Sequence, residues 1–435
     1  MYLKRIVEEK IEKIIKTGRA IQIIGPKWCG KTTLASKYCK STINFQDPSK
    51  KDYYRYTINE NIYSLLSHPK PLLIDEWQEF KEIWNAIKIK VDQSTSNETE
   101  YFLTGSTVPY STEGLHTGIG RIVTVKLSTF TLYETGESDG FVSLRTLFDK
   151  NTHIQHNNKE LNLEEIAFYI CRGGWPEAST RFKEEPTQIA KDYFENLIDK
   201  DLSNYDGVKR SKQLASAILY SYARNISTID NQNKKNKVIF DDVRHNYGEV
   251  TDMTIINYLN VFKSLFVIQE LRAWSPNIRS KTKIRTGKKK LFLDTSIACA
   301  ALKQKPRELL NDVRTLGLLF ENFVAHELIT YLQDYGEIEH YRDDYGIECD
   351  FVLRMANGKY ALCQSKLTLN NIEGAINAME KICDLIIKHN EKKPETPHKL
   401  PSFLMVVVGS SSIAYTKQSK HNIPIHIVPI NTLKP

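Results

Sequence analysis

The chain has 435 residues, of which 41% are hydrophobic and 26% charged, the composition of a folded protein with about two to four domains. Seven scattered cysteines without a C-x-x-C pair argue against a disulfide framework or a zinc site, and no apolar run approaches the roughly 18 residues of a membrane span, so we expect a cytoplasmic protein with no membrane partner. The net charge of +8 is concentrated in residues 205–290, which contain 17 Lys and Arg against seven Asp and Glu.

Short apolar runs alternate with helical patterns in the first 130 residues, which predicts an α/β domain built on a mainly parallel sheet. The apolar spacing between Leu3 and Ile15 predicts a packing helix ahead of the first strand. Ligands of such sheets bind beyond the carboxyl ends of the strands. The expected strands are residues 20–24, 43–45, 71–74, 101–103 and 122–127, with helices at 31–39 and 83–91.

Residues 25–32 read GPKWCGKT, a complete G-x-x-x-x-G-K-[ST] phosphate loop that follows the first expected strand. Backbone N–H groups of such a loop converge on phosphate at the positive end of the next helix. Lys31 is predicted to reach the β- and γ-phosphates and Thr32 to ligate Mg²⁺. The loop predicts ATP and Mg²⁺ as cofactors, and the expected nucleotide-binding residues are Gly25, Pro26, Lys27, Trp28, Cys29, Gly30, Lys31, Thr32 and Thr33.

Acidic and hydroxyl residues close the next strands. Asp75 and Glu76 follow the run Leu72-Leu73-Ile74, the Walker B arrangement in which Asp75 holds Mg²⁺ and Glu76 orients and deprotonates the attacking water. Thr104 ends the following strand, where it either polarises the same water or caps a turn. We therefore predict Lys31, Glu76 and Thr104 as catalytic residues.

Arg121 ends the segment HTGIGR and directly precedes the strand expected at 122–127. In ring-forming ATPases this position supplies an arginine finger to the nucleotide of a neighbouring subunit. A surface arginine at a strand start is the alternative. The finger interpretation adds Arg121 to the catalytic candidates and implies a homo-oligomer.

The ordered segments GPKWCGKT, PLLIDEWQ, YFLTGST, HTGIGRI, LYETGES and GGWPEAS resemble bacterial and archaeal AAA-type ATPases that carry a C-terminal domain of uncharacterised function. The resemblance covers nearly all of the chain. It implies a P-loop ATPase of AAA or STAND type, with a helical lid after the core in which the GGxP break lies.

Two modules are expected after the core. Residues 161–182 read as a lid helix broken at GGWP, and residues 211–293 read as three helices and a hairpin, a winged helix with Thr254, Asn257, Tyr258 and Lys263 facing outward. The stretch 279–290 has seven basic residues and no acid, which favours DNA phosphates as a partner; a solvated loop or a module for protein contacts is the alternative. The predicted DNA contacts are Lys281, Lys283, Arg285, Lys288, Lys289 and Lys290.

The last 135 residues resemble the restriction-endonuclease-like PD-(D/E)xK fold, in which two carboxylates hold Mg²⁺ and a lysine stabilises charge on phosphate. Asp350 lies in the strand expected at 349–354, Lys366 ends the strand expected at 360–366, and Glu321 lies in the first turns of the helix expected at 317–335. Gln364 stands where the motif requires an acid, and it lacks the charge for tight Mg²⁺ binding. We therefore interpret Glu321, Asp350, Gln364 and Lys366 as a nuclease-like remnant, with Glu348 as a further acid on the strand of Asp350.

The predicted domains are an ATPase core (1–145), a helical lid (146–205), a winged helix with a basic wing (206–300) and a nuclease-like domain (301–435). The leading hypothesis is an ATP-hydrolysing switch or remodelling protein that binds ATP and ADP and associates with DNA. Two other functions are open: an adaptor that binds ATP without turning it over, and an ATP-gated nuclease.

Overall fold

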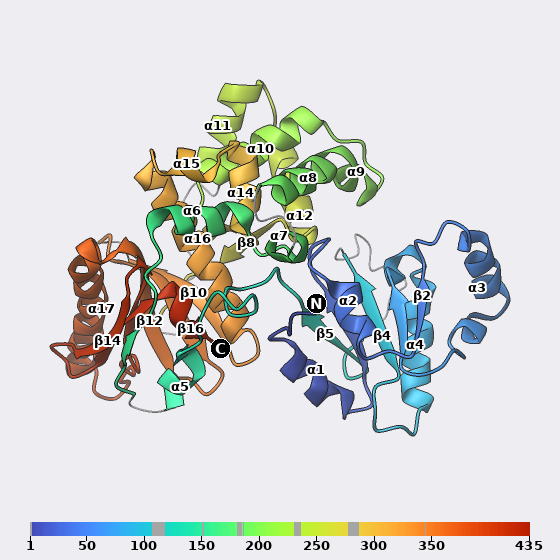
Figure 1. The fold of residues 1–435 in the computed structure, drawn as a ribbon, viewed down its shortest axis with the longest axis horizontal. Helices are drawn as coiled ribbons and strands as arrows, with labels where there is room; N and C mark the ends of the chain where they lie inside the picture. Colours follow the sequence, from blue (N-terminus) through green and yellow to red (C-terminus); the bar gives the residue numbers. More distant parts are fainter. Residues whose placement is uncertain are drawn as a thin grey trace.

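The computed structural model describes residues 2–106, 118–149, 152–180, 185, 187–229, 236–276, 287–343 and 345–435. Two sheets lie at opposite ends of the molecule, and a largely helical region lies above and between them (Figure 1). The parallel sheet at the N-terminal end confirms the predicted α/β class.

The N-terminal sheet has five parallel strands in the order β2-β3-β4-β1-β5. Its central strands are buried on both faces, which is why they read as continuous apolar runs in the sequence. All five expected strands are present: β1 (Ala20–Ile24), β2 (Ser41–Asn44), β3 (Leu72–Asp75), β4 (Tyr101–Gly105) and β5 (Ile122–Lys126).

Helices cover both faces of this sheet. Ile11 of α1 and Leu34 of α2 pack on one face, and Leu65 of α3 and Ile83 of α4 pack on the other. The predicted packing helix is confirmed by α1, whereas the sequence pattern did not reveal α3. The bounds are α1 (Glu8–Ile15), α2 (Lys31–Ser36), α3 (Lys51–Leu65), the 3₁₀ turn η1 (Trp77–Glu79) and α4 (Glu82–Gln93).

The helical region contains the predicted broken lid helix and the predicted three helices with their hairpin. An antiparallel pair, β8 (Ile268–Leu271) and β9 (Lys289–Phe292), follows the third helix. Tyr258 is buried, so its predicted outward direction was wrong. The helices are α6 (Leu163–Arg172), α7 (Pro176–Thr180), α8 (Gln188–Asn196), the π-helix η2 (Leu197–Asp201), α9 (Leu202–Asn204), α10 (Lys212–Arg224), α11 (Lys237–Tyr247), α12 (Asp252–Ser264), α14 (Thr295–Leu302) and α15 (Pro306–Leu309).

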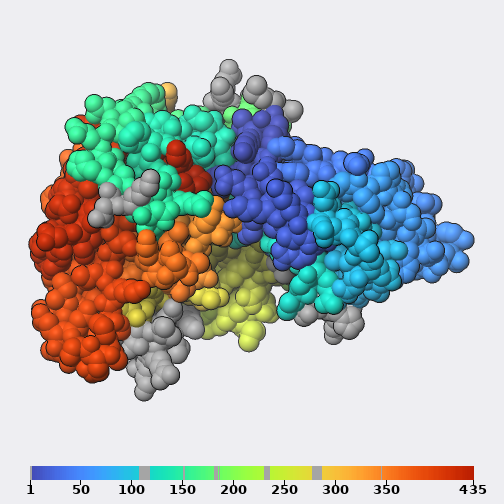
Figure 2. All heavy atoms as spheres, turned by 90° about the horizontal axis from the view of Figure 1, so that it is seen from below, coloured from blue at the N-terminus to red at the C-terminus, as the bar shows by residue number. Residues whose placement is uncertain are grey.

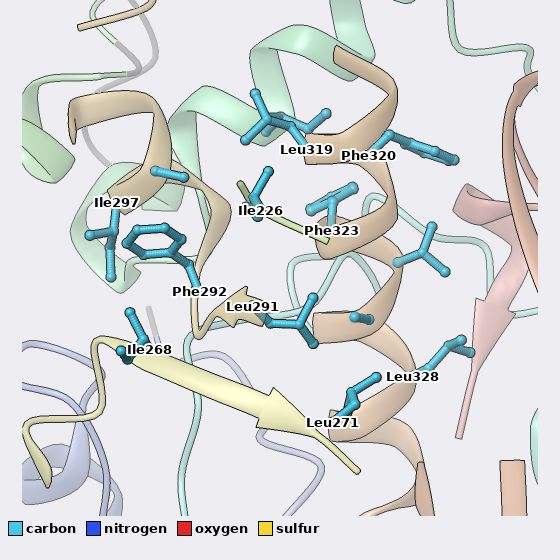
Figure 3. Packing of buried hydrophobic residues seen from close by; sticks show 14 of the residues in the cluster. Ile226, Ile268, Leu271, Leu291, Phe292, Ile297, Leu319, Phe320, Phe323 and Leu328 are labelled. Carbon is cyan, nitrogen blue, oxygen red and sulfur yellow. The ribbon is translucent and has the colours of Figure 1, made fainter. Parts of the chain in front are cut away.

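One continuous apolar core joins the helical region to the C-terminal domain. Leu291 and Phe292 of β9 lie between Ile297 of α14 and Leu319 and Phe323 of α16 (Val313–Leu332) (Figure 3). Burial of this shared apolar surface fixes the β8–β9 hairpin against α16.

The C-terminal sheet has seven strands in the order β10-β11-β12-β13-β15-β14-β7. Phe320 of α16 packs on one face, and Met379 of α17 (Ile372–Lys392) packs on the other. The strands are β10 (Gly336–Arg342), β11 (Glu348–Met355), β12 (Tyr360–Thr368), β13 (Leu404–Ser410), β14 (Ile413–Gln418) and β15 (Pro424–Pro429), with 3₁₀ turns η3 (Leu369–Asn371) and η4 (Ile430–Thr432).

The segment after the ATPase core returns to this distant sheet before the lid begins. Strand β7 (Gln155–Asn157) pairs with β14, and β6 (Val142–Ser143), which precedes α5 (Leu144–Asp149), pairs with β16 (Leu433–Lys434). Figure 2 shows this green part of the chain against the red C-terminal part. Residues 155–157 fall within the segment expected to be the lid, because a strand this short carries no recognisable sequence pattern.

Candidate functional site

The predicted phosphate loop connects β1 to α2 and curls around its own lysine. Gly30 adopts φ +95° at the start of α2, a conformation that favours glycine. The buried Lys31 ammonium donates to the backbone oxygens of Gly25 at 3.1 Å and Pro26 at 2.7 Å. The loop backbone and the lysine therefore surround one small volume at the N-terminus of α2.

Asp75 connects two other predicted site residues, Thr32 and Thr104. Its Oδ1 accepts a 2.9 Å hydrogen bond from the Thr32 hydroxyl and a second hydrogen bond from the Thr104 hydroxyl. Thr104 stands beside Asp75 because β3 and β4 pair in parallel register. The hydroxyl of the loop, the acid of β3 and the hydroxyl of β4 thus meet at the carboxyl edge of the sheet, where the sequence placed them.

Glu76 lies next to this group in an uncommon backbone conformation, with φ +54°. The Ser106 hydroxyl donates to Glu76 Oε1 at 2.6 Å, and the Gln78 side chain donates to the other carboxylate oxygen. Two neighbours therefore fix the orientation of the carboxylate. Neither Ser106 nor Gln78 was among the site residues predicted from the sequence.

A cavity of about 560 Å³ opens over these groups. Lys31, Thr32, Asp75 and Glu76 line it from the ATPase core. The helical region closes its other side with residues that sequence reasoning did not assign to the site. These are Trp175, Pro176, Glu177 and Ile189, and Gln46 joins them from the end of β2. The GGWP motif was the available signal for the first two.

A second cavity of about 360 Å³ adjoins the first and shares Gly30, Thr33, Pro176 and Glu177 with it. Its remaining walls come from the N-terminal segment, the start of α2 and the end of α7, and are Tyr2, Leu3, Arg5, Cys29, Leu34, Phe130 and Thr180. Burial raises the pKa of the Cys29 thiol, so this wall carries no thiolate.

The segments LYETGES and GGWPEAS form the junction between the core and the helical region. Glu134 accepts from Arg5 at 2.9 Å, and Arg5 also donates to the Cys29 backbone oxygen of the phosphate loop at 3.0 Å. Glu137 accepts two hydrogen bonds from Arg172 at the end of α6. Each glutamate of LYETGES thus binds an arginine from a different part of the chain, Arg5 ahead of α1 and Arg172 at the end of α6.

Arg121 does not reach the site. Arg121 precedes β5, so it lies at the amino ends of the parallel strands, whereas the phosphate loop follows the carboxyl end of β1. Its half-exposed guanidinium donates a hydrogen bond to Asp92 at 2.8 Å. The predicted finger therefore lies away from the nucleotide site of its own chain, and a role toward a neighbouring subunit stays a prediction.

The predicted basic wing is only partly within the described residues. Lys281, Lys283 and Arg285 lie outside them. Lys288 is exposed and pairs with Glu270 at 2.9 Å. Lys289 and Lys290 were predicted to contact DNA, and this was wrong: both are buried in β9, with 0% and 2% exposure. A buried ammonium does not reach an external phosphate.

Lys289 lies among the acids of the nuclease-like remnant. Its Nζ is 2.6 Å from Glu321 Oε1, and it lies 3.8 Å from carboxylate oxygens of both Glu348 and Asp350. We call these four residues the Lys289 cluster. Burial alone would lower the pKa of Lys289, but the three carboxylates raise it above its ordinary value, so the ammonium stays charged.

The other remnant residues surround this cluster. The Gln364 amide donates to the Glu348 backbone oxygen at 2.9 Å, Ser365 donates twice to Asp350, and Lys366 is half-buried on the same strand. Burial and the Asp350 charge raise the pKa of Glu321 to about 7 although Lys289 opposes this shift. Among the described residues no three His, Cys, Asp or Glu side chains are arranged to hold a metal ion.

Comparison with protein families assigns the core and leaves the rest without a function. Residues 17–136 match the model of an AAA domain. The N-terminal domain is of the AAA P-loop type. Residues 163–308 and 316–428 match two domains of unknown function, so the AAA resemblance is confirmed while the restriction-endonuclease-like assignment has no support from a family. No curated protein matches the chain.

Solved structures with distant likeness include a Walker-type ATPase of Pyrococcus abyssi (13% identity, 69% of this chain and 96% of that chain, TM-score 0.39). They also include the Aeropyrum pernix ORC1 protein in complex with DNA (8%, 71% and 94%, 0.27) and Drosophila ORC bound to DNA (12%, 64% and 89%, 0.21). No described helix has the length and apolarity needed to cross a membrane.

Proposed function

We propose that this chain is a Mg²⁺-dependent ATPase whose nucleotide state acts on the helical region. The observation that carries the proposal is the meeting of Thr32, Asp75 and Thr104 beside the phosphate loop. The lid residues Trp175 and Pro176 line the same cavity, so a bound nucleotide would contact both the core and the helical region.

The residues present fit a magnesium ion. A threonine hydroxyl 2.9 Å from a carboxylate oxygen supplies two hard oxygen ligands of the kind Mg²⁺ prefers. Thr32 and Asp75 would hold the ion, and Thr104 would orient Asp75. When bound, the ion would neutralise charge on the β- and γ-phosphates.

The adjoining 360 Å³ cavity is the place for the base and ribose. It lies beyond the Gly30 end of α2, whose N-terminus the phosphates would approach. Its walls come from Tyr2 and Leu3 on one side and Pro176 and Thr180 on the other. A nucleoside there would be enclosed between the N-terminal segment and α7.

Glu76 is the residue we assign to activation of the attacking water. Ser106 and Gln78 orient its carboxylate, and it faces the same cavity as Lys31. An adaptor that binds ATP without hydrolysis would have no use for an oriented acid at this position. The arrangement therefore favours hydrolysis over the adaptor.

The test is ATP turnover by the full chain compared with Lys31→Ala and Glu76→Gln. We expect Lys31→Ala to lose nucleotide binding, and Glu76→Gln to bind ATP while its turnover falls by about 100-fold or more, because a positioned general base contributes about that much. Binding of ATP without measurable turnover by the wild-type chain, even with duplex DNA present and at assembling concentration, would favour the adaptor.

DNA association is the second part of the proposal, and it rests on the basic stretch alone. Charge reversal of Lys281, Lys283 and Arg285 together is expected to weaken binding of any duplex and to reduce its salt dependence. Glu substitution of Lys288 is the comparison: that lysine already pairs with Glu270, so its reversal should weaken DNA binding less than the triple variant does. Unchanged DNA affinity in the triple variant would remove this part of the proposal.

A role of Arg121 toward a neighbouring subunit is the third part. The arginine is exposed at the sheet edge away from its own nucleotide site, which is what a contribution in trans requires. Mixing Arg121→Ala with Lys31→Ala subunits tests it. Because each lacks a different half of a shared site, mixed assemblies should recover part of the turnover that each variant lacks alone.

A further inference from the structure

Two adjacent residues of the phosphate loop make contacts outside the ATPase core. Lys27 Nζ lies 2.6 Å from Asp201 Oδ1, and the Trp28 ring packs edge-on against Tyr193 with ring centroids 5.9 Å apart. Tyr193 belongs to α8, and Asp201 is the last residue of η2, the π-helix that continues α8. The tip of the loop is therefore bound to this helix pair at two points.

The backbone at this tip is strained. Trp28 is not a glycine, yet it adopts φ +64°. Such conformations persist only where the surroundings impose them, and they concentrate at functional sites. A π-helix is likewise rare and is frequent at functional sites. The strained Trp28 and the π-helix lie on opposite sides of the same contact.

Lys27 also stands at the boundary between two cavities. It lines the 560 Å³ cavity over the phosphate loop and a neighbouring one of about 460 Å³, together with Gln46, Glu76 and Ser106. Its side chain is 40% exposed, whereas that of Asp201 is 14% exposed. The lysine has room to move, while Asp201 is enclosed.

We propose that Lys27 is a second phosphate-binding lysine and that Asp201 controls whether it is available. The inference rests on the proposed function and specifies how the site distinguishes ATP from ADP. The Asp201 carboxylate and a terminal phosphate compete for one ammonium. A γ-phosphate, which brings additional negative charge beside Glu76, draws Lys27 from Asp201 and frees the loop from η2; ADP leaves the ion pair intact.

The Asp201 carboxylate and a phosphate can compete for the Lys27 ammonium on similar energetic terms. A partly exposed ion pair contributes little net stability, so a phosphate with several charged oxygens can replace the carboxylate. The ion pair must nevertheless be broken before Lys27 binds phosphate, which reduces affinity for ATP. Removing the Asp201 charge removes this cost and should improve binding of the triphosphate only.

The experiment measures the dissociation constants of a non-hydrolysable ATP analogue and of ADP, both with Mg²⁺, for the full-length chain. Asp201→Asn should bind the analogue about threefold to tenfold more tightly with less than a twofold change for ADP. Lys27→Met should weaken the analogue about tenfold and ADP less than twofold, and the double variant should resemble Lys27→Met. Lys27→Arg should keep the wild-type ratio, because it retains the charge.

The matched control is Asp199→Asn. Asp199 lies in the same π-helix but pairs with Lys212, at 2.7 Å, away from the loop. We expect it to leave both constants unchanged. Equal changes for the analogue and ADP in Asp201→Asn, or a gain that persists in the double variant, would overturn the inference alone. Failure of the wild-type chain to bind either nucleotide would overturn the proposed function and this inference with it.

Discussion

The Thr32 hydroxyl lies 2.9 Å from the Asp75 carboxylate, although 43 positions separate the two residues. They meet because α2 begins beyond β1, and β3 ends at the same edge of the sheet, with only β4 between the two strands. Parallel strands bring their carboxyl ends together, so residues distant in sequence converge without any local signal linking them.

The Thr104 hydrogen bond to Asp75 predicts a specific catalytic defect. Thr104→Val keeps the shape of the side chain but loses the donor, so Asp75 is oriented less well. We expect kcat for ATP to fall about tenfold, equivalent to about 1.4 kcal/mol, with a smaller change in KM. Thr124→Val is the control, because Thr124 donates to Gln22 in the same sheet at 2.9 Å. Equal effects of the two substitutions would contradict the assigned role.

The Lys289 cluster predicts a large stability loss. Lys289→Met leaves Glu321, Glu348 and Asp350 without their buried counter-charge, which typically costs about 3–5 kcal/mol. Lys288→Met, on the adjacent exposed lysine, should cost under about 1 kcal/mol. Urea unfolding monitored by circular dichroism distinguishes them. A loss below about 1 kcal/mol for Lys289→Met would show that the cluster is not closed in solution.

The same cluster predicts the direction of a pH effect. The pKa of Glu321 is raised from 4.5 to about 7 in the folded chain. The unfolded chain releases this proton more readily, so this group costs stability as the pH rises from about 4.5 to about 7. Lys289→Met removes the charge that opposes the shift, so its destabilisation should be greater at pH 8 than at pH 6. The reverse order in unfolding curves at the two pH values would contradict this assignment.

Cleavage of DNA by the C-terminal domain is not expected. The Lys289 ammonium is already paired with carboxylates that a divalent cation would need, and Gln364 replaces the expected acid. Wild-type protein with Mg²⁺ or Mn²⁺ and ATP should leave supercoiled plasmid intact. Metal-dependent nicking that disappears in Asp350→Ala would show that the lysine moves away and that the domain is a nuclease.

The close packing at Gly174 predicts that the GGWP motif is sensitive to substitution. A Cβ at this position would lie 2.0 Å from the Phe130 backbone oxygen, so Gly174→Ala must displace the lid from the core. We expect destabilisation of about 1–3 kcal/mol and a higher KM for ATP, because Trp175 and Pro176 line the cavity. Gly374→Ala is the control: its Cβ enters open space on α17, and replacing a helical glycine should stabilise by up to about 1 kcal/mol. Unfolding midpoints and ATP titrations test both.

Local residue order was enough to predict much of the fold and the centre of the site. Buried parallel strands such as Leu72–Asp75 read as continuous apolar runs, and the phosphate loop is a contiguous motif whose backbone makes the site. The helices and hairpin between Lys212 and Phe292 were visible for the same reason, since each has its own apolar period. These strands, helices and the phosphate loop could be recognised from neighbouring residues alone, without knowledge of any contact distant in sequence.

The partners of charged residues were decided only by the tertiary structure. A lysine in a basic stretch has the same sequence signature whether it faces solvent or, like Lys289, lies against Glu321 and Asp350 within the protein. Lys27 likewise reads as one residue of a motif, and only folding brings Asp201 to it across 174 positions. Long-range contacts follow from strand pairing and the burial of shared apolar faces, and neither leaves a signal in the residues next to the charge.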